Sequence, residues 1–318
     1  MGEAMSDREG SINYDGDKGQ LVLTAGDAAS TKPLFFEYLE LTKPRLSLLS
    51  VITAIVGYLA ALPARDSSVL ISLIAGTSLA AGGAAALNMW MERESDALMV
   101  RTRDRPVPSG TISSESALAL GLVLCAGGDI LLLIGVNGLA AFLALATQAT
   151  YLLAYTPSKK ATSWCTEIGA IPGALPPLIG WAGAGAGISA LGWVLFAILL
   201  FWQIPHFMAI AWTHREDYRR AGFPMATVID GSGRTASLKA FVCTITLVLC
   251  SLLPTVLGFT TAAYAVVAGI AGTWFLVRSI RFLDPATRDS EARQLFFASI
   301  AYLPILLAAL VIDRILLV

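Results

Sequence analysis

The chain has 318 residues, of which 56% are hydrophobic and only 14% are charged, and its formal net charge is −1. A soluble domain is typically about 45–50% apolar and about 25% charged. This composition therefore excludes a soluble globular protein, and it also excludes disorder over most of the length. The mean hydropathy of +0.69 is instead typical of a protein that crosses the membrane several times.

The first 32 residues are polar and contain no apolar run, so they do not indicate a cleaved secretory signal. We expect a disordered tail over residues 1–32 and one membrane domain over residues 33–318. A helix needs about 20 apolar residues to cross the hydrocarbon layer. By this measure the sequence predicts an all-α bundle of nine membrane helices, at 45–62, 69–91, 115–135, 138–156, 165–183, 189–212, 236–258, 261–281 and 295–315.

The basic residues of the predicted loops indicate how the bundle is oriented. They gather after the second, fourth, sixth and eighth helices, whereas only Arg65 and Arg314 fall on the other side. Cytoplasmic loops are enriched in Lys and Arg, so we expect a cytoplasmic N-terminus in the cell inner membrane. The loops after the second and sixth helices are the longest, and long loops are often functional. We therefore expect the active site on the cytoplasmic side.

Asn88, Glu92 and Asp96 occur at every fourth residue near the end of the second predicted helix. Residues four apart share a helix face, where two carboxylates repel each other, and an unpaired acid near the membrane is costly. Mg²⁺ would offset this charge, because it binds one or two carboxylates together with water and substrate phosphates. We therefore predict that Asn88, Glu92 and Asp96 hold Mg²⁺. A solvated acidic helix end is the alternative.

Arg101, Arg103 and Arg105 alternate in the loop that follows, which ends at Pro106. Arginine binds anions through several hydrogen bonds at once. Because these side chains lie next to the acidic residues, we interpret them as binding a diphosphate substrate. The alternative is the ordinary positive charge of a cytoplasmic loop. Further binding side chains are expected at neighbouring helix ends: Lys43, Arg45, Tyr155, Lys159 and Lys160.

A second polar cluster follows the sixth predicted helix and contains His206 and Asp217. Asp217 is a candidate ligand for a second metal. His206 is a candidate binding residue, with a purely packing role as the alternative. Glu167, at the start of the fifth predicted helix, is an acid within the membrane and so a functional candidate. Alternatively, Glu167 lies at the membrane interface, where its side chain reaches water or pairs with Lys159 or Lys160.

Covalent catalysis has no support in the sequence. The four cysteines lie singly in apolar segments, and neither a CxxC pair nor a phosphate-binding glycine loop is present. These absences favour metal-assisted ionisation over a nucleophilic mechanism. We also expect no nucleic-acid partner.

Six motifs resemble those of the UbiA-type intramembrane prenyltransferases, and among these the branch that farnesylates heme. The resemblance covers roughly residues 33–318. It is carried by Leu41–Arg45, Asn88–Pro106, Tyr155–Lys160, Gly173–Trp181, Trp202–Phe207 and Arg215–Tyr218.

The resemblance implies a nine-helix fold and transfer of a farnesyl group from farnesyl diphosphate to a vinyl group of heme B. Mg²⁺ would bind the diphosphate, with the arginines and lysines assisting, and His206 would contact heme or diphosphate. The isoprenoid tail would lie between helices and enter from the lipid bilayer. A heme A synthase or an oxidase-assembly protein would be a partner.

The sequence departs from the family pattern at three places. Glu92 stands where many members have Asp, and the second cluster has no D-x-x-x-D pair. Ser158, Cys165 and Glu167 stand where Leu, Asn and an apolar residue are expected. Two other functions fit part of the pattern. One is prenylation of an aromatic quinone precursor, against which Trp202–Phe207 argues; the other is transport of anionic amphiphiles, for which inverted repeats would be expected.

Overall fold

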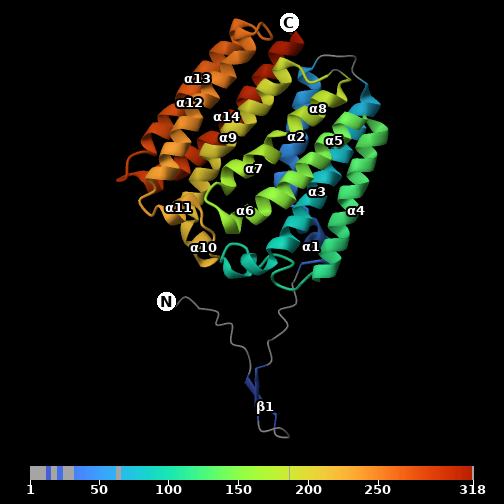
Figure 1. The fold of residues 1–318 in the computed structure, drawn as a ribbon, viewed down its shortest axis with the longest axis vertical. Coiled ribbons are helices and arrows are strands. Elements are labelled where there is room, and N and C mark those ends of the chain that lie inside the picture. Colours follow the sequence, from blue (N-terminus) through green and yellow to red (C-terminus); the bar gives the residue numbers. More distant parts are fainter. Residues whose placement is uncertain (1–11, 16–19, 24–31, 62–65, 186, 317–318) are drawn as a thin grey trace, which may run out of the picture.

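The computed structural model describes residues 12–15, 20–23, 32–61, 66–185 and 187–316, and most of these residues are helical (Figure 1). In chain order the elements are β1 (Ile12–Asp15), β2 (Gln20–Leu23), α1 (Leu34–Leu41), α2 (Pro44–Ala60), α3 (Ser67–Leu98), α4 (Ser114–Gly135), α5 (Gly138–Ala149), the π-helical η1 (Thr150–Tyr155), α6 (Thr156–Ala161), α7 (Cys165–Ala174), α8 (Pro176–Gly183), α9 (Ala190–Thr213), α10 (Arg215–Arg220), α11 (Ala226–Ile229), α12 (Arg234–Val256), α13 (Ala262–Arg281) and α14 (Arg288–Leu316).

The two strands lie within the segment expected to be a disordered tail. They pair antiparallel, with Ile12 opposite Leu23 and Asp15 opposite Gln20. A hairpin of two short strands is at best marginally stable in water. The rest of residues 1–31 lies outside the described residues, so disorder of the tail stays a prediction. Arg65, which was predicted on the outer side, also lies outside the described residues.

Seven helices of the described chain are long and apolar enough to cross a membrane. They are α3, α4, the continuous run Gly138–Ala161, α9, α12, α13 and α14. An eighth crossing results if α1 and α2, which meet at a bend of 49°, form one broken span. The bundle of apolar helices is confirmed, whereas the predicted count of nine goes beyond what these lengths show.

The fifth predicted span, 165–183, is two short helices instead of one long one. α7 ends at Ala174 and α8 begins at Pro176. A proline has no backbone N–H and disfavours helical geometry in the residue before it, so Pro176 and Pro177 explain the break. Glycines then let the broken segment pack closely, since a Cβ at Gly180 would lie 1.7 Å from the carbonyl oxygen of Ala54 on α2.

Polar caps mark several helix starts. The Asp66 carboxylate accepts from the Ser68 backbone N–H at the start of α3, and Asn137 accepts from the Ala140 N–H at the start of α5. Such caps satisfy backbone donors that have no partner inside the helix. They place the helix boundaries within a few residues of the predicted ones, although α3 runs on to Leu98 and α14 already starts at Arg288.

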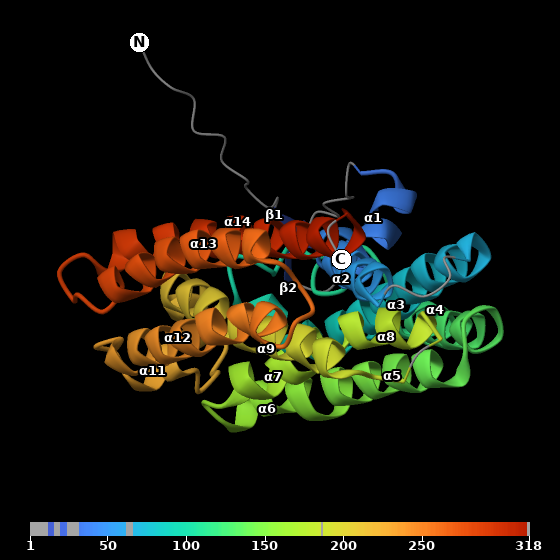
Figure 2. The ribbon, with the colours of Figure 1, turned by 90° about the horizontal axis from the view of Figure 1, so that it is seen from above.

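The helices pack as a ring around a central space. α2 contacts α3 and α8, α4 contacts α3 and α5, and α7 contacts α9; the ring continues through α12, α13 and α14, and α14 returns to α2. Figure 2 shows α13 and α14 across the bundle from α5 and α6. Many large apolar side chains point outward, among them Ile134, which is 80% exposed, and Val256, which is 76% exposed. Such a surface suits the hydrocarbon of a bilayer.

Candidate active site

A cavity of about 390 Å³ lies inside the ring, with walls from α2, α3, α5, η1, α7, α8 and α9. The α3 wall changes character along the helix: Ala80, Ala84 and Ala85 come first, and Asn88, Glu92 and Asp96 follow. Since a helix rises about 1.5 Å per residue, the cavity has an apolar part and a polar end. The predicted face formed by Asn88, Glu92 and Asp96 is therefore confirmed as helical, and it faces an enclosed space.

Lysine and arginine side chains balance the two carboxylates. Lys159 Nζ lies 2.7 Å from Glu92 Oε1 and donates a hydrogen bond to Oε2 at 3.0 Å. Arg105 Nη1 donates to Asp96 Oδ2 at 2.7 Å, and the Asp96 side chain is 2% exposed. Burying an acid without a partner is costly. These two ion pairs therefore explain how two carboxylates one turn apart are accommodated in the wall.

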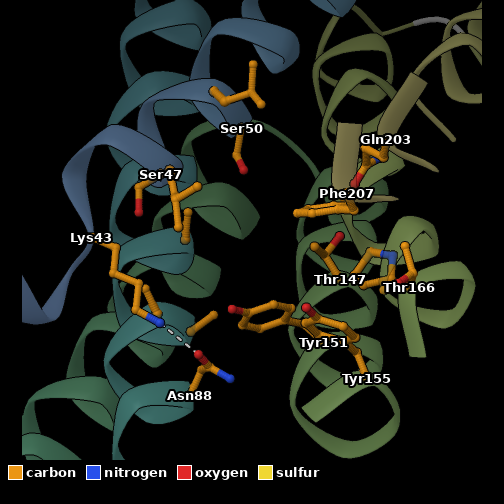
Figure 3. Close-up of a pocket in the computed structure, with 18 of the residues that line it drawn as sticks. Lys43, Ser47, Ser50, Asn88, Thr147, Tyr151, Tyr155, Thr166, Gln203 and Phe207 are labelled. Carbon is orange, nitrogen blue, oxygen red and sulfur yellow. Dashed lines mark hydrogen bonds between the residues drawn. The ribbon is translucent and has the colours of Figure 1, made fainter. Parts of the chain in front are cut away.

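Lys43 and Asn88 connect α2, α3 and α6 at the polar end. Lys43 Nζ donates to Asn88 Oδ1 at 2.8 Å, drawn as the dashed line in Figure 3. Asn88 Nδ2 in turn donates to Thr156 Oγ1 at 3.0 Å. Lys43 is the one residue other than glycine in the described chain with a positive φ, 44°. The left-handed region costs a side-chain-bearing residue about 1–2 kcal/mol, so the surrounding contacts hold Lys43 in a strained conformation.

Two tyrosines of η1 point into the cavity opposite Lys43 (Figure 3). Tyr155 was predicted as a binding residue, but Tyr151 was not. Lys159 Nζ lies 4.6 Å from the centre of the Tyr155 ring, within cation–π range. π-Helical turns are frequently found at functional sites. Here the turn precedes Pro157, which supplies no N–H to the helix, and it brings both rings to the cavity.

The predicted arginines of the loop after α3 divide into two groups. Arg101 and Arg105 line the cavity, whereas Arg103 is exposed outside it. The loop is not extended: Arg103 N–H donates to Met99 O, and Arg105 N–H donates to Thr102 O. In such helical turns, residues four apart share a face and those two apart do not, which explains why Arg103 points away.

Three other predicted binding residues lie outside the cavity wall. Lys160 is exposed, and Arg45 lies outside the α2 wall. His206 faces α14, where its ring stacks between Trp202 at 5.0 Å and Phe296 at 5.1 Å. Its Nδ1 is 2.7 Å from Ser299 Oγ.

Asp217, on α10, contacts the segment that follows α3. Its Oδ1 accepts from the Val100 backbone N–H at 3.3 Å and from Arg220 at 2.9 Å. It is not among the residues of the cavity wall, although its neighbour Tyr218 is. Its role as a second metal ligand therefore stays a prediction. Beside it, partial burial and the positive charge of Arg101 lower the pKa of His214, so this imidazole is neutral at pH 7.

Glu167 pairs with a lysine of α12. Its carboxylate accepts from Lys239, whose Nζ lies 4.2 Å from the centre of the Trp164 ring. The pairing with Lys159 or Lys160 considered from the sequence is wrong, because Lys159 is held by Glu92 and Lys160 points outward. Glu167 thus fastens α7 to α12 beside the cavity.

Gln148 is a cavity residue that the sequence analysis missed. It lines the α5 wall, and its Nε2 donates to Asp129 Oδ1 on α4 at 2.8 Å. An acid in the middle of an apolar helix is by default a functional candidate, so Asp129 was the signal that could have led to this pair.

The donor set fits a hard divalent cation. Mg²⁺ prefers oxygen ligands and needs only one or two carboxylates when substrate phosphates and water complete its shell. Glu92 and Asp96 supply such oxygens at the cavity wall, where Lys159 and Arg105 now pair with them. Within that part, no group of three or more His, Cys, Asp or Glu residues forms a complete metal site. A cation here would therefore need ligands from the substrate.

Known proteins resemble this chain over most of its length. Residues 50–301 match the UbiA prenyltransferase family. A protein of Opitutus terrae named protoheme IX farnesyltransferase is 55% identical over 284 residues, 89% of this chain and 96% of that protein.

Two solved structures share the fold. A digeranylgeranylglyceryl phosphate synthase has a TM-score of 0.74 at 19% identity, and the match covers 88% of this chain and 98% of that one. A UbiA homolog from Archaeoglobus fulgidus bound to GPP and Mg²⁺ has a TM-score of 0.62 at 14% identity, over 86% and 99%.

Proposed function

The chain belongs to the UbiA prenyltransferase family, and from this premise we propose that it transfers a farnesyl group from farnesyl diphosphate to a vinyl group of heme B, forming heme O. The name of the Opitutus terrae relative supports this donor and acceptor, because that protein is 55% identical to this chain over 89% of its length. The GPP and Mg²⁺ bound by the Archaeoglobus fulgidus homolog support a prenyl diphosphate and a magnesium ion as ligands of the fold.

The change from apolar to polar wall along α3 is the observation that carries the proposal. Farnesyl diphosphate is an amphiphile with an isoprenoid tail and a diphosphate head. The tail suits the alanine-lined part of α3 together with Ile179 and Phe207, and the head suits the polar end at Glu92 and Asp96. A pocket for a purely polar or a purely apolar ligand would not combine these walls.

Cationic side chains at the polar end stabilise the leaving group. Lys43, Lys159 and Arg105 converge there, and in the described structure they neutralise the carboxylates or bind Asn88. When diphosphate is bound, the same donors shift to its oxygens, as suits charge-assisted hydrogen bonds. Mg²⁺ held by Asn88, Glu92 and Asp96 would add further positive charge at the leaving diphosphate.

The reaction then proceeds by ionisation. The C–O bond of farnesyl diphosphate breaks, its electron pair leaves with the diphosphate, and an allylic cation remains. A vinyl carbon of heme B forms the new C–C bond, and water adds to the resulting cation with loss of a proton. The apolar wall keeps water away until the vinyl group attacks, and the fixed charges stabilise the leaving group without reorganisation.

The membrane arrangement is part of the proposal. We propose nine crossings, with α1–α2 and α7–α8 each forming one broken span, and a cytoplasmic N-terminus in the cell inner membrane. The basic loops support this orientation, in which the polar end of the cavity would face the cytoplasm. A partner that acts on heme O stays a prediction.

The purified protein in lipid nanodiscs, given heme B, farnesyl diphosphate and Mg²⁺, is expected to form heme O, detected by mass spectrometry. Excess EDTA should stop the reaction, and Mg²⁺ should restore it. An aromatic quinone precursor in place of heme B tests the other acceptor class and should give no product. The proposal is overturned if no farnesylated heme forms at any Mg²⁺ concentration.

Replacing Lys43 with glycine separates stability from activity. Glycine adopts a positive φ without strain, so the free energy of unfolding is expected to stay within about 1 kcal/mol of wild type. Because the Lys43 amine is lost from the polar end, kcat/KM for heme O formation should fall at least about tenfold. Thermal unfolding in detergent and steady-state kinetics measure the two effects. Wild-type kinetics in this variant would mean that Lys43 serves only the bend between α1 and α2.

A further inference from the structure

A second cavity, of about 650 Å³, lies beside the first between α1 and the start of α2. Four cationic side chains line it, Lys32, Lys43, Arg45 and Arg105, against one carboxylate, Glu40. The rest of its wall is mainly apolar, with Phe36 and Leu39 from α1. This combination points to a ligand that is both anionic and apolar.

The charges of this cavity are only partly compensated by the protein. Lys32 pairs with Glu40 at 2.9 Å, and Arg105 pairs with Asp96 of the first cavity. Among the described residues, the Lys43 amine donates its hydrogen bond to the neutral side-chain amide of Asn88. Within the described part of the chain, the Arg45 side chain makes no hydrogen bond or ion pair, and it is exposed. Arg45 thus leaves a positive charge that a ligand anion would balance.

α1 gives this cavity access to the membrane. Its exposed side chains include Leu34 at 61% and Phe35 at 70%, and Phe36 is 54% exposed. A short helix with such side chains suits the interface between headgroups and hydrocarbon. An amphiphile held in the bilayer can therefore reach the cavity sideways, past α1.

The two cavities are adjacent, because Lys43 and Arg105 line both. A ligand in the second cavity therefore lies next to the polar end, where the diphosphate is proposed to bind. Heme B is a flat apolar macrocycle with two propionate carboxylates at one edge and vinyl groups elsewhere on its rim. Resting on the proposed function, we propose that the second cavity binds the acceptor, with Arg45 holding a propionate carboxylate while a vinyl group reaches the first cavity.

This assignment changes the role expected for Arg45. Its position in the sequence predicted a diphosphate-binding residue, but Arg45 lines the second cavity and not the first, whereas Lys159 lines the first and not the second. Arg45 therefore selects the acceptor, and Lys159 serves the donor. Lys43 stands between them and serves both.

The test compares Arg45→Gln, Lys159→Met and a control, Arg293→Gln, which removes an exposed arginine of α14. In nanodiscs of zwitterionic lipid, Arg45→Gln should raise the KM for heme B about tenfold, the effect of one charge-assisted hydrogen bond, and leave the KM for farnesyl diphosphate unchanged. Lys159→Met should do the reverse, and Arg293→Gln should change neither constant.

Binding without turnover provides a second readout. The Soret band, titrated with heme B, should show about tenfold weaker binding to Arg45→Gln than to wild type. Heme B dimethyl ester, which lacks the free carboxylates, should bind both proteins equally weakly. If the variant and wild type bind heme B equally, the assignment is overturned, even when wild type still makes heme O. If wild type forms no heme O, the proposed function itself fails.

Phospholipid is the other source of an anionic headgroup. If Arg45→Gln alters heme binding only in nanodiscs that contain anionic lipid, the cavity holds a lipid phosphate, and the acceptor assignment is overturned. An effect of the same size in both lipid compositions supports the propionate.

Discussion

Asp96→Asn is expected to lower kcat/KM for heme O formation by about 10²–10³-fold, the loss typical of removing one preorganised charge from an active site. The substitution keeps the shape of the side chain but removes its negative charge. It deletes a proposed metal ligand and leaves the Arg105 guanidinium, now 2.7 Å from Asp96 Oδ2, without its counter-ion. Glu92→Gln should have a similar effect, because its carboxylate occupies the same face of α3 one turn away.

A matched variant on the same helix provides the control. Glu94 is exposed and lies outside the cavity wall, and its carboxylate lies 3.5 Å from Arg93 at the surface. Exposed ion pairs contribute little, so Glu94→Gln should retain wild-type kinetics. A general loss of charge from the end of α3 would affect all three variants alike.

Arg105→Met distinguishes a metal ligand from an ion-pair partner. If Asp96 binds Mg²⁺, Asp96→Asn should raise the Mg²⁺ concentration for half-maximal activity, whereas Arg105→Met should raise the KM for farnesyl diphosphate at an unchanged Mg²⁺ requirement. Equal Mg²⁺ profiles for the two variants, or wild-type turnover by Asp96→Asn, would show that Asp96 only positions Arg105.

The sequence was most informative where one helix carries the pattern. Asn88, Glu92 and Asp96 repeat every fourth residue, and α3 places all three in the cavity wall. The break at Pro176, where α8 begins just after α7 ends, also has its cause within one segment. Periodicity and proline act within a segment, so no knowledge of neighbouring helices was needed.

Partners across helices were beyond such reasoning. Lys159 and Lys160 are adjacent, but only Lys159 reaches Glu92, which is 67 residues away in sequence. Glu167 takes its lysine from α12 instead. Which of two neighbouring cations meets an acid depends on helix rotation and on the distance between helices, and these are fixed by close packing of the whole ring.

Local backbone geometry limited the interpretation of the loops. Arginines at 101, 103 and 105 share one face only if the loop is extended. The turns at Thr102 and Arg105 show that it is not extended, so the three side chains do not point the same way. Tyr151 was missed because the π-helical turn of η1 alters the spacing at which residues share a face. Neither feature has a reliable sequence signature.

Gly180→Ala is expected to destabilise the protein by about 2–3 kcal/mol, the upper range for adding a methyl group to a close-packed interior. A Cβ at this position would lie 1.7 Å from Ala54 O and 2.9 Å from Tyr58 N. Both are backbone atoms of α2, so no side chain can rotate away. Small residues let membrane helices approach closely where no hydrophobic force between them is available, and α8 would have to move away from α2.

The same contact recurs from the α2 side. A Cβ at Gly57 would lie 2.0 Å from Pro177 O on α8, so Gly57→Ala should destabilise by a comparable amount. The control is Gly127→Ala on α4, where nothing lies within 4 Å of the added carbon. Alanine favours a helix over glycine by about 1 kcal/mol, so this variant should be as stable as wild type or more stable. Thermal unfolding in one detergent ranks the three variants.

Displacement of α8 should also reach the site. Ser50 and Thr53 of α2 and Ile179 of α8 line the first cavity, next to the glycine contacts. Any Gly180→Ala protein that folds should therefore bind farnesyl diphosphate more weakly while keeping its Mg²⁺ requirement, because Glu92 and Asp96 lie on α3. If Gly180→Ala matches wild type in both thermal unfolding and substrate binding, α2 and α8 are not in close contact in the membrane.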